Sequence, residues 1–385
     1  MKPLMHTTRS PLPTILAATL LALQGGGLAS AEPAKPAALT WPYASEAVSP
    51  VEQLAVISPT TGYACPVIVR RPPGPGPFPL VVVLHGGTVP HDAQWLRKNA
   101  MTQHNVVRLL AAGYAIALPS FSSRKEDPQT TAALRDCQAV LDHVRHLPGI
   151  DPESLFVFGG SGGGSLALEL AGEAKLAAVA AGEPANVLFT GVWTKDNIPQ
   201  LDAIMFDPLK FCDNDKVRSF TRAKIDRIAC PVLIVHSDVH SINKINDVFV
   251  IPLMKEAGKA PEVCYIPGAR HGFYFASRET PVATLKAFEA IETFFRRYTH
   301  TPPKPIEAAS LELRSTTPGE AGADALSPVP RAGSTRAGKA SSTDKSDIDW
   351  NRVRTLRRRV LAGETLSPED QSYYEKGKAA WPPRQ

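Results

Sequence analysis

Closely spaced pairs of cysteines are missing from this sequence of 385 residues. Its five cysteines are scattered, and no two have the Cys-x-x-Cys spacing typical of zinc and iron–sulfur sites. No cofactor motif is present either, so we expect neither a metal nor a cofactor. An alternative metal site made from His85, His91 and Asp92 stays open, as does a single disulfide among the five thiols.

A membrane-spanning run is also missing from the N-terminal region. The apolar stretch at residues 11–23 is too short to cross a bilayer. It follows the basic residues Lys2 and Arg9 and precedes an Ala-Ser-Ala sequence at 29–31, which is the pattern of a signal peptide. No cysteine follows that site, which argues against a lipid anchor. We therefore expect residues 1–31 to be removed on export, leaving a secreted or periplasmic protein without stable membrane insertion.

A strong excess of charge of one sign is missing too. The formal net charge is +5 and is spread along the chain, so we expect no nucleic-acid partner. The dense basic cluster at residues 357–359 is interpreted as a solvated helix face, with a binding patch as the alternative.

What the sequence does contain is a glycine-rich stretch, VFGGSGGGSLALEL, at residues 157–170. A P-loop would need a lysine directly after the glycines, and none follows until Lys175. A dinucleotide-binding loop would need Gly-x-Gly-x-x-Gly and an acidic residue about 20 positions on, and only Glu183, followed by Pro184, is available. The residue types therefore argue against a phosphate-binding loop.

The same stretch fits a nucleophile elbow. Residues 159–163 read Gly-x-Ser-x-Gly, after the strand-like LFVF and before the helix-like SLALELAGEA. Glycines permit the sharp turn and the close packing of neighbouring segments, which leaves the Ser161 hydroxyl at the tip. Ser161 is therefore the predicted nucleophile, and a chance match within a glycine-rich loop is the alternative.

Short apolar runs bounded by glycine and proline alternate with helical patterns from about residue 51 to residue 300. This alternation predicts an α/β fold with a mainly parallel sheet covered by helices on both faces. The predicted strands are CPVIVR, LVVVLHG, YAIALPS, LFVFGG, LAAVAAG, PVLIVHS and VCYIPG, and the predicted helices span residues 131–147, 165–174, 241–258 and 281–298.

Composition divides the rest of the chain. We expect an extended segment at 32–50, the α/β domain at 51–300, a disordered linker rich in Pro, Ser and Ala at 301–346, and a short helical tail at 347–385. In the tail, Ser367 is the expected N-cap of a helix that begins with Pro368.

One part of the α/β domain, residues 185–229, interrupts the alternation and is the expected lid or cap. Four of its aromatic residues either line an acyl pocket or pack in the core: Phe189, Trp193, Phe206 and Phe211. Their role therefore depends on the tertiary structure.

A serine nucleophile needs a base, and in elbow hydrolases the chain order is serine, acid, histidine. His271 follows the last predicted strand in a turn between Gly268 and Gly272, so it is the predicted base, with a surface histidine as the alternative. Asp238 follows the preceding strand, PVLIVH, and is the predicted acid that orients the imidazole.

An oxyanion hole needs backbone N–H donors aimed at the developing negative charge. Gly162 follows the nucleophile and supplies the first expected donor. The second expected donor is Gly87, in the loop after the strand LVVVLHG. His85, in the same loop, is interpreted as structural.

These motifs resemble the α/β-hydrolase superfamily, and within it the exported esterases similar to dienelactone hydrolase and prolyl oligopeptidase. The resemblance spans about residues 51–298 and rests on LHGG, GIDPESLFVFGGSGGG, CPVLIVHSD and YIPGARHGF. Many relatives have an aspartate where His240 falls here, which leaves the acid's role to Asp238 or to an acid from elsewhere. Dienelactone hydrolase has a cysteine nucleophile where this chain has Ser161, so its substrate does not carry over.

The predicted function is an exported serine hydrolase that cleaves carboxylic esters through an acyl-enzyme on Ser161. Small esters, or acyl groups on carbohydrates, are the expected substrates. Two alternatives stay open: a small peptidase similar to prolyl oligopeptidase, and a non-catalytic binding protein on a hydrolase scaffold. The large N-terminal propeller usual in those peptidases does not fit in the residues before Val51.

Overall fold

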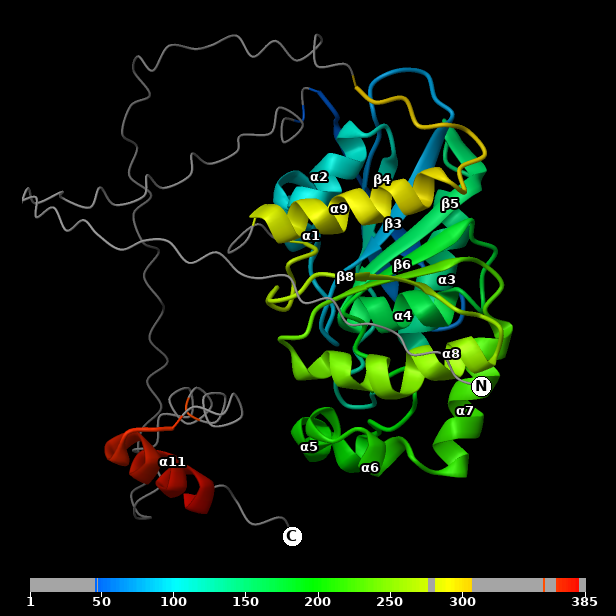
Figure 1. The fold of residues 1–385 in the computed structure, drawn as a ribbon. Coiled ribbons are helices and arrows are strands. Elements are labelled where there is room, and N and C mark those ends of the chain that lie inside the picture. Colours follow the sequence, from blue (N-terminus) through cyan, green and yellow to red (C-terminus); the bar gives the residue numbers. More distant parts are fainter. Residues whose placement is uncertain (1–45, 47, 276–280, 307–355, 357–364, 381–385) are drawn as a thin grey trace, which may run out of the picture. The chain divides into compact units, whose positions relative to one another are not determined.

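The computed structural model describes residues 46, 48–275, 281–306, 356 and 365–380 (Figure 1). The predicted signal peptide, almost all of the extended segment and most of the linker lie outside these residues. The chain divides into two units, Met1–Ser315 and Thr316–Gln385.

Eight strands of the first unit form one sheet, in the order β1-β2-β4-β3-β5-β6-β7-β8. β2 runs antiparallel to β1 and β4, whereas every neighbouring pair from β4 to β8 is parallel. The prediction of a mainly parallel sheet is therefore confirmed. The strands are β1 Val51–Ile57, β2 Ala64–Arg70, β3 Phe78–Leu84, β4 Ala115–Pro119, β5 Ile150–Gly160, β6 Ala178–Gly182, β7 Val232–His236 and β8 Glu262–Tyr265.

The composition of the strands explains their places in the sheet. β4, β6 and β7 are buried along their whole length and are almost entirely apolar, as strands covered on both faces should be. β1 is absent from the predicted strands because it lies at the edge of the sheet. Only Val56 is buried in it, and the polar residues Glu52 and Gln53 interrupt its apolar sequence.

Helices cover both faces of the sheet (Figure 1). The first core includes buried residues of α1, α2 and α9, and the second includes buried residues of α3, α4 and α8. Alternate side chains of β3 point to opposite faces, so that Val81 and Val83 join the first core and Leu80 and Val82 the second. The helices are α1 Ala93–Thr102, α2 His104–Ala111, α3 Ala132–Val144, α4 Gly162–Leu170, α8 Ile251–Glu256 and α9 Pro281–Arg296.

The expected lid, residues 185–229, connects β6 to β7 through short helices. Of the four aromatic residues considered above, Phe189 and Trp193 are buried in the second core, Phe211 packs against that core and Phe206 is exposed. Most of this aromatic set therefore belongs to the core. The helices are η2 Lys195–Gln200, α5 Leu201–Phe206, α6 Leu209–Cys212 and α7 Asp215–Arg227.

The helix predicted over residues 241–258 is not continuous. A 3₁₀ turn, η3 (Ser241–Asn243), and a π turn, η4 (Asn246–Val250), precede α8. Pro252 explains the last boundary, because proline has no backbone N–H to extend an upstream helix and fits the first turn of a new one.

The second unit contains α11 (Pro368–Ala380). The Ser367 hydroxyl accepts a hydrogen bond from the Asp370 N–H at 3.2 Å, which confirms the predicted N-cap. Among the residues that the structure describes in either unit, every helix is too short or too polar to span a bilayer.

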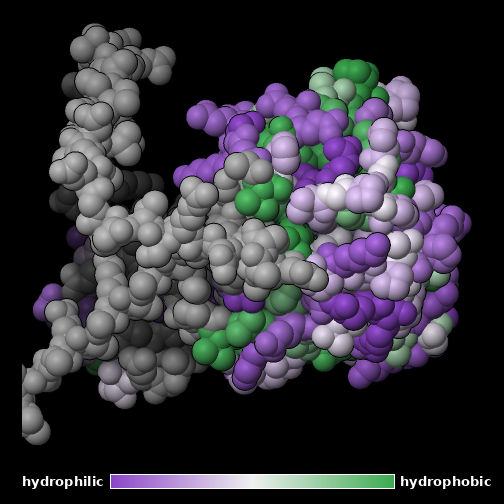
Figure 2. All heavy atoms as spheres, turned by 90° about the horizontal axis from the view of Figure 1, so that it is seen from above, coloured by the Kyte–Doolittle hydropathy of each residue, from purple (hydrophilic) through white to green (hydrophobic). Residues whose placement is uncertain are grey.

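The surface of the first unit is largely hydrophilic on the face seen in Figure 2, and its hydrophobic residues form separate patches. Large apolar side chains exposed on this unit include Ile57, Val263 and Tyr265, which belong to the edge strands β1 and β8. Single exposed residues of this kind are ordinary on a protein surface.

The contact between β3 and α4 gives a stability prediction. A Cβ at Gly163 would overlap the carbonyl oxygens of Leu84 and His85 at the end of β3. We expect Gly163→Ala to lower the free energy of unfolding by about 3 kcal/mol, measured by urea denaturation, because neither backbone can move away freely.

The matched control is Gly62→Ala. Gly62 has a positive φ of 73°, which is strained for alanine, but nothing lies within 4 Å of the position that a Cβ would take there. The cost of this control should therefore be only about 1 kcal/mol. Equal losses in the two variants would show that the β3–α4 contact does not limit residue 163.

Candidate active site

Ser161 occupies the sharp turn between β5 and α4, as predicted. Its φ of 53° and ψ of −117° lie in a region that is strained for a residue with a side chain. Three backbone hydrogen bonds hold the turn: the Ser161 N–H donates to Gly182, and its carbonyl accepts from Ser165 and Ala185. The strained conformation therefore persists because its neighbours fix it.

The glycines around Ser161 each meet a close neighbour. A Cβ at Gly160 would overlap the rings of Tyr274 and Phe275, and one at Gly162 would overlap the Gly87 carbonyl oxygen. A Cβ at Gly159 would overlap the backbone of α4. This close packing is the physical reason for the glycine-rich sequence.

The loop after β3 lies beside this turn. A Cβ at Gly86 would lie 3.4 Å from the Ser161 Cβ, and Gly87 has a φ of 83°. The two predicted oxyanion donors, Gly87 and Gly162, therefore lie on adjacent backbones beside Ser161. The arrangement can present backbone N–H groups to an oxyanion formed at Ser161.

His85 packs under this loop. It is buried, it stacks on Phe121 with 4.2 Å between ring centroids, and its Nδ1 lies 2.9 Å from the Gly86 carbonyl oxygen. Burial lowers the pKa of His85 to about 4, so the ring is neutral near pH 7. These contacts support a structural role.

The side chains of the alternative metal site, His91 and Asp92 among them, make other contacts. His91 stacks on Trp95 at 3.7 Å, and the Asp92 carboxylate accepts from the Trp95 N–H as the N-cap of α1. Within the described residues, no group of three or more His, Cys, Asp or Glu side chains could hold a metal ion. All five cysteines fall in the described chain and are free thiols.

His271 is paired with an acid that the sequence analysis did not assign to it. Its Nδ1 lies 2.7 Å from Oε2 of Glu183, the first residue after β6. Glu183 is fully buried and has a φ of 40°. The hydrogen bonds of Ser161 reach Gly182 and Ala185, on either side of Glu183, so the turn and the carboxylate are tied together.

Polar groups surround the Glu183 carboxylate. Oε1 accepts from the Ser237 hydroxyl at 2.8 Å and from Asn243 Nδ2 at 2.9 Å, and Oε2 accepts from the Gly272 N–H at 3.1 Å. Burial by itself would raise the pKa of Glu183, but the hydrogen bond and charge of His271, together with the bonds from Asn243 and Ser237, hold this pKa below its usual value. The carboxylate is therefore ionised at neutral pH.

The structure does not bring Asp238, the predicted acid, to His271. Asp238 is exposed and accepts a hydrogen bond from the Gly268 N–H at 2.8 Å. That bond lowers the pKa of Asp238. The physical reason is the direction of the chain after β7: Ser237 points inward to Glu183, and the next residue points outward.

His240 lies against the ring of His271. Its ring stacks on His271 with 4.4 Å between the centroids and 28° between the planes. Its Nδ1 accepts from the Ile242 N–H at 3.2 Å, which leaves Nε2 as the protonated nitrogen of the neutral ring. His240 therefore covers one face of the His271 imidazole.

The missed residue, Glu183, carried a signal in the sequence. It directly follows the predicted strand LAAVAAG, just as Asp238 closely follows PVLIVH. The same criterion, an acid at the end of a buried strand, would therefore have named both residues as candidates.

A family model matches part of this chain. The BD-FAE family model matches residues 68–182, which include the Gly87 loop and the Ser161 turn. Curated proteins gave no sequence match.

Solved structures with a similar fold have low sequence identity. An acylaminoacyl peptidase from Pyrococcus horikoshii has a TM-score of 0.50 at 14% identity, over 69% of this chain and 44% of that chain. Carboxyl esterase 2 from Tuber melanosporum has a TM-score of 0.48 at 19% identity, over 66% of this chain and 87% of that chain. An esterase from Thermogutta terrifontis has a TM-score of 0.47 at 18% identity, over 67% of this chain and 96% of that chain.

The lowered pKa of Glu183 predicts how stability depends on pH. Because the ionised form is favoured in the fold, its contribution is complete above the ordinary pKa near 4.5 and is lost as the pH falls through the lower native pKa. We expect Glu183→Gln to cost about 2 kcal/mol of unfolding free energy at pH 7, and clearly less at pH 3.5.

The control is Glu126→Gln, which removes an exposed carboxylate and should give near wild-type stability at both pH values. Chemical denaturation at each pH measures all three proteins. A Glu183→Gln deficit that stays the same at pH 3.5 would contradict the ionised, stabilising carboxylate.

Proposed function

We propose that this chain, which has the α/β-hydrolase fold, is a serine hydrolase that cleaves carboxylic esters. In this proposal Ser161 is the nucleophile, His271 the base, and Glu183 the acid in place of Asp238. The observation that carries it is the buried Glu183–His271 pair, because Glu183 is tied through its neighbours Gly182 and Ala185 to the strained turn of Ser161.

The proton follows a simple path in this mechanism. Glu183 accepts the Nδ1–H of His271, which leaves Nε2 unprotonated and able to take the Ser161 hydroxyl proton. The Ser161 oxygen forms a bond to the ester carbonyl carbon, and the protonated imidazole returns the proton to the departing alkoxide, which leaves as an alcohol. Water then attacks the acyl-enzyme by the same route, releasing the carboxylic acid and free Ser161.

The negative charge develops on the carbonyl oxygen during both attacks. We assign its stabilisation to the backbone N–H groups of Gly162 and Gly87, whose backbones touch beside Ser161. No side chain is needed for this step, which agrees with the neutral, buried state of His85.

Ester substrates are favoured by the match to the BD-FAE family model, since it covers both the oxyanion loop and the nucleophile turn. Acyl groups on carbohydrates are the narrower substrate class within this proposal. A small peptidase is the second candidate, and the fold shared with the acylaminoacyl peptidase favours it.

Export is part of the proposal and rests on the N-terminal sequence alone. Residues 1–31 would act as a signal peptide, and the mature enzyme would work outside the cytoplasm. N-terminal sequencing of the protein recovered from the medium or the periplasm tests this, with Glu32 expected as the first residue.

Labelling of the purified protein with a fluorophosphonate tests the nucleophile. We expect near-stoichiometric labelling of the wild type and none of Ser161→Ala, because only an activated serine reacts with the probe. Cys264→Ala removes a free thiol instead and serves as a control that should label normally. A folded wild-type protein that fails to label would favour a binding role for the scaffold.

Two acid variants test the assignment of Glu183. We expect Glu183→Gln to lower kcat for p-nitrophenyl acetate by about 10³-fold or more, because the imidazole loses its orienting and charge-balancing partner. Asp238→Asn should stay within about two-fold of the wild type, since Asp238 contacts Gly268 and not His271. The opposite ranking would return the acid's role to Asp238.

A panel of aminoacyl-p-nitroanilides separates the two candidate functions. Ester cleavage without hydrolysis of the anilides supports the esterase, and efficient anilide hydrolysis that depends on Ser161 would support the peptidase.

A further inference from the structure

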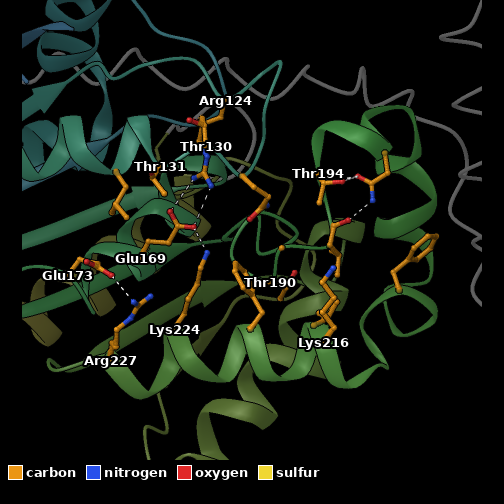
Figure 3. A pocket seen from close by; sticks show the side chains of 18 of the residues that line it. Arg124, Thr130, Thr131, Glu169, Glu173, Thr190, Thr194, Lys216, Lys224 and Arg227 are labelled. Atoms are coloured by element: carbon orange, nitrogen blue, oxygen red, sulfur yellow. Dashed lines mark hydrogen bonds and ion pairs between the residues drawn. The ribbon is translucent and has the colours of Figure 1, made fainter. Parts of the chain in front are cut away.

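A cavity of about 780 Å³ lies between α3, α4 and the segment of residues 190–227 (Figure 3). Its lining contains none of the proposed catalytic residues. Glu169 in its wall is eight residues along α4 from Ser161, which corresponds to about 12 Å at the helical rise per residue. The cavity is therefore separate from the ester-cleaving centre.

Two cations converge on one buried carboxylate in this cavity. Lys224 Nζ lies 2.9 Å from Glu169 Oε1, and the Arg124 guanidinium lies 3.4 and 3.5 Å from the two oxygens (Figure 3). The exposed fractions of the Arg124 and Glu169 side chains are only 3% and 7%. The contacts of Arg124 are longer than the roughly 2.7–2.9 Å typical of a charge-assisted bond. One carboxylate thus balances the buried Arg124 and the partly buried Lys224, and leaves a positive charge.

The same imbalance recurs nearer the surface. Arg227 and Arg135 share Glu173, at 3.3 and 3.9 Å, and Lys216 adds a further cation from α7. The lining therefore holds five cationic side chains and two carboxylates. A concave surface with this excess attracts anions.

The remaining wall is apolar. Phe220 on α7 lines the cavity although 45% of it is exposed, and Lys224 Nζ lies 4.7 Å from its ring centroid. Leu134, Val192 and Phe211 complete this wall. A ring or chain of a ligand can pack there while an anionic group reaches the cations.

We propose that this cavity binds a small organic anion: an apolar, ring-containing body with one carboxylate, sulfonate or phosphate group. The anion lies against Lys224 and Arg124, and the body lies against Phe220. The volume falls within the range of about 300–1,000 Å³ of small-molecule sites. Because the site does not include Ser161, binding there is independent of the proposed ester hydrolysis.

The test uses two fluorescent probes with related rings. 8-Anilinonaphthalene-1-sulfonate carries the anionic group, and N-phenyl-1-naphthylamine has the same rings without it. We expect saturable binding of the sulfonate with a stoichiometry of one. Lys224→Met should weaken this binding roughly ten-fold or more and leave binding of the neutral probe unaffected.

Three further variants keep the result interpretable. Lys216→Met removes an exposed cation of the lining and should weaken the sulfonate without risk to folding, whereas Lys210→Met removes an exposed lysine outside the lining and should change nothing. Ser161→Ala should bind both probes like the wild type. Absence of saturable binding, binding insensitive to both Lys224→Met and Lys216→Met, or displacement of the sulfonate by fluorophosphonate labelling of Ser161 would each overturn the proposal.

Discussion

The end of the sheet that carries Ser161 depends on one steric constraint, the close approach of β3, β5 and α4 around this residue. At residues 159, 160, 162 and 163 a side chain would overlap backbone or an aromatic ring. Glycine destabilises the fold by about 0.5–1 kcal/mol relative to alanine through lost chain entropy. All four of these positions are nevertheless glycine. The four glycines allow β5 to pass into α4 through a sharp turn that presents Ser161. The hydrogen bonds of that serine to Gly182 and Ala185 then fix its position relative to the next strand.

Glu183 extends this constraint to the other strands. A buried carboxylate is stable only when donors or cations compensate for its lost hydration. Its donors come from the loops after β7 (Ser237 and Asn243) and β8 (His271 and Gly272). One charge therefore joins the ends of three parallel strands. The interaction that orders these loops also orients the imidazole, so loop structure and the proposed chemistry have the same physical origin.

The elements predicted from the sequence are those whose signals are local. Seven strands follow from apolar runs, and the Ser161 turn follows from its own glycines. The carboxylate that pairs with His271 was not identified, because acids at two strand ends, Glu183 and Asp238, meet the same local criterion. The choice between them depends on which loop His271 approaches and on which residue after β7 faces inward. The charged cavity was also beyond prediction, since Arg124, Glu169 and Lys224 come from segments far apart in the chain.

Helix α4 connects the Ser161 turn at its N-terminus with the charged cavity at its C-terminus. Its N-terminus carries the partial positive charge of the helix dipole next to Ser161, where it favours an oxyanion. Its C-terminus carries partial negative charge, so an anionic side chain in the last turn is unfavourable. Glu169 lies in that turn. Its ion pairs with Arg124 and Lys224 compensate for this unfavourable position. Together they more than compensate for the carboxylate and the dipole. An excess of positive charge thus arises at the far end of the helix whose near end supports the proposed nucleophile.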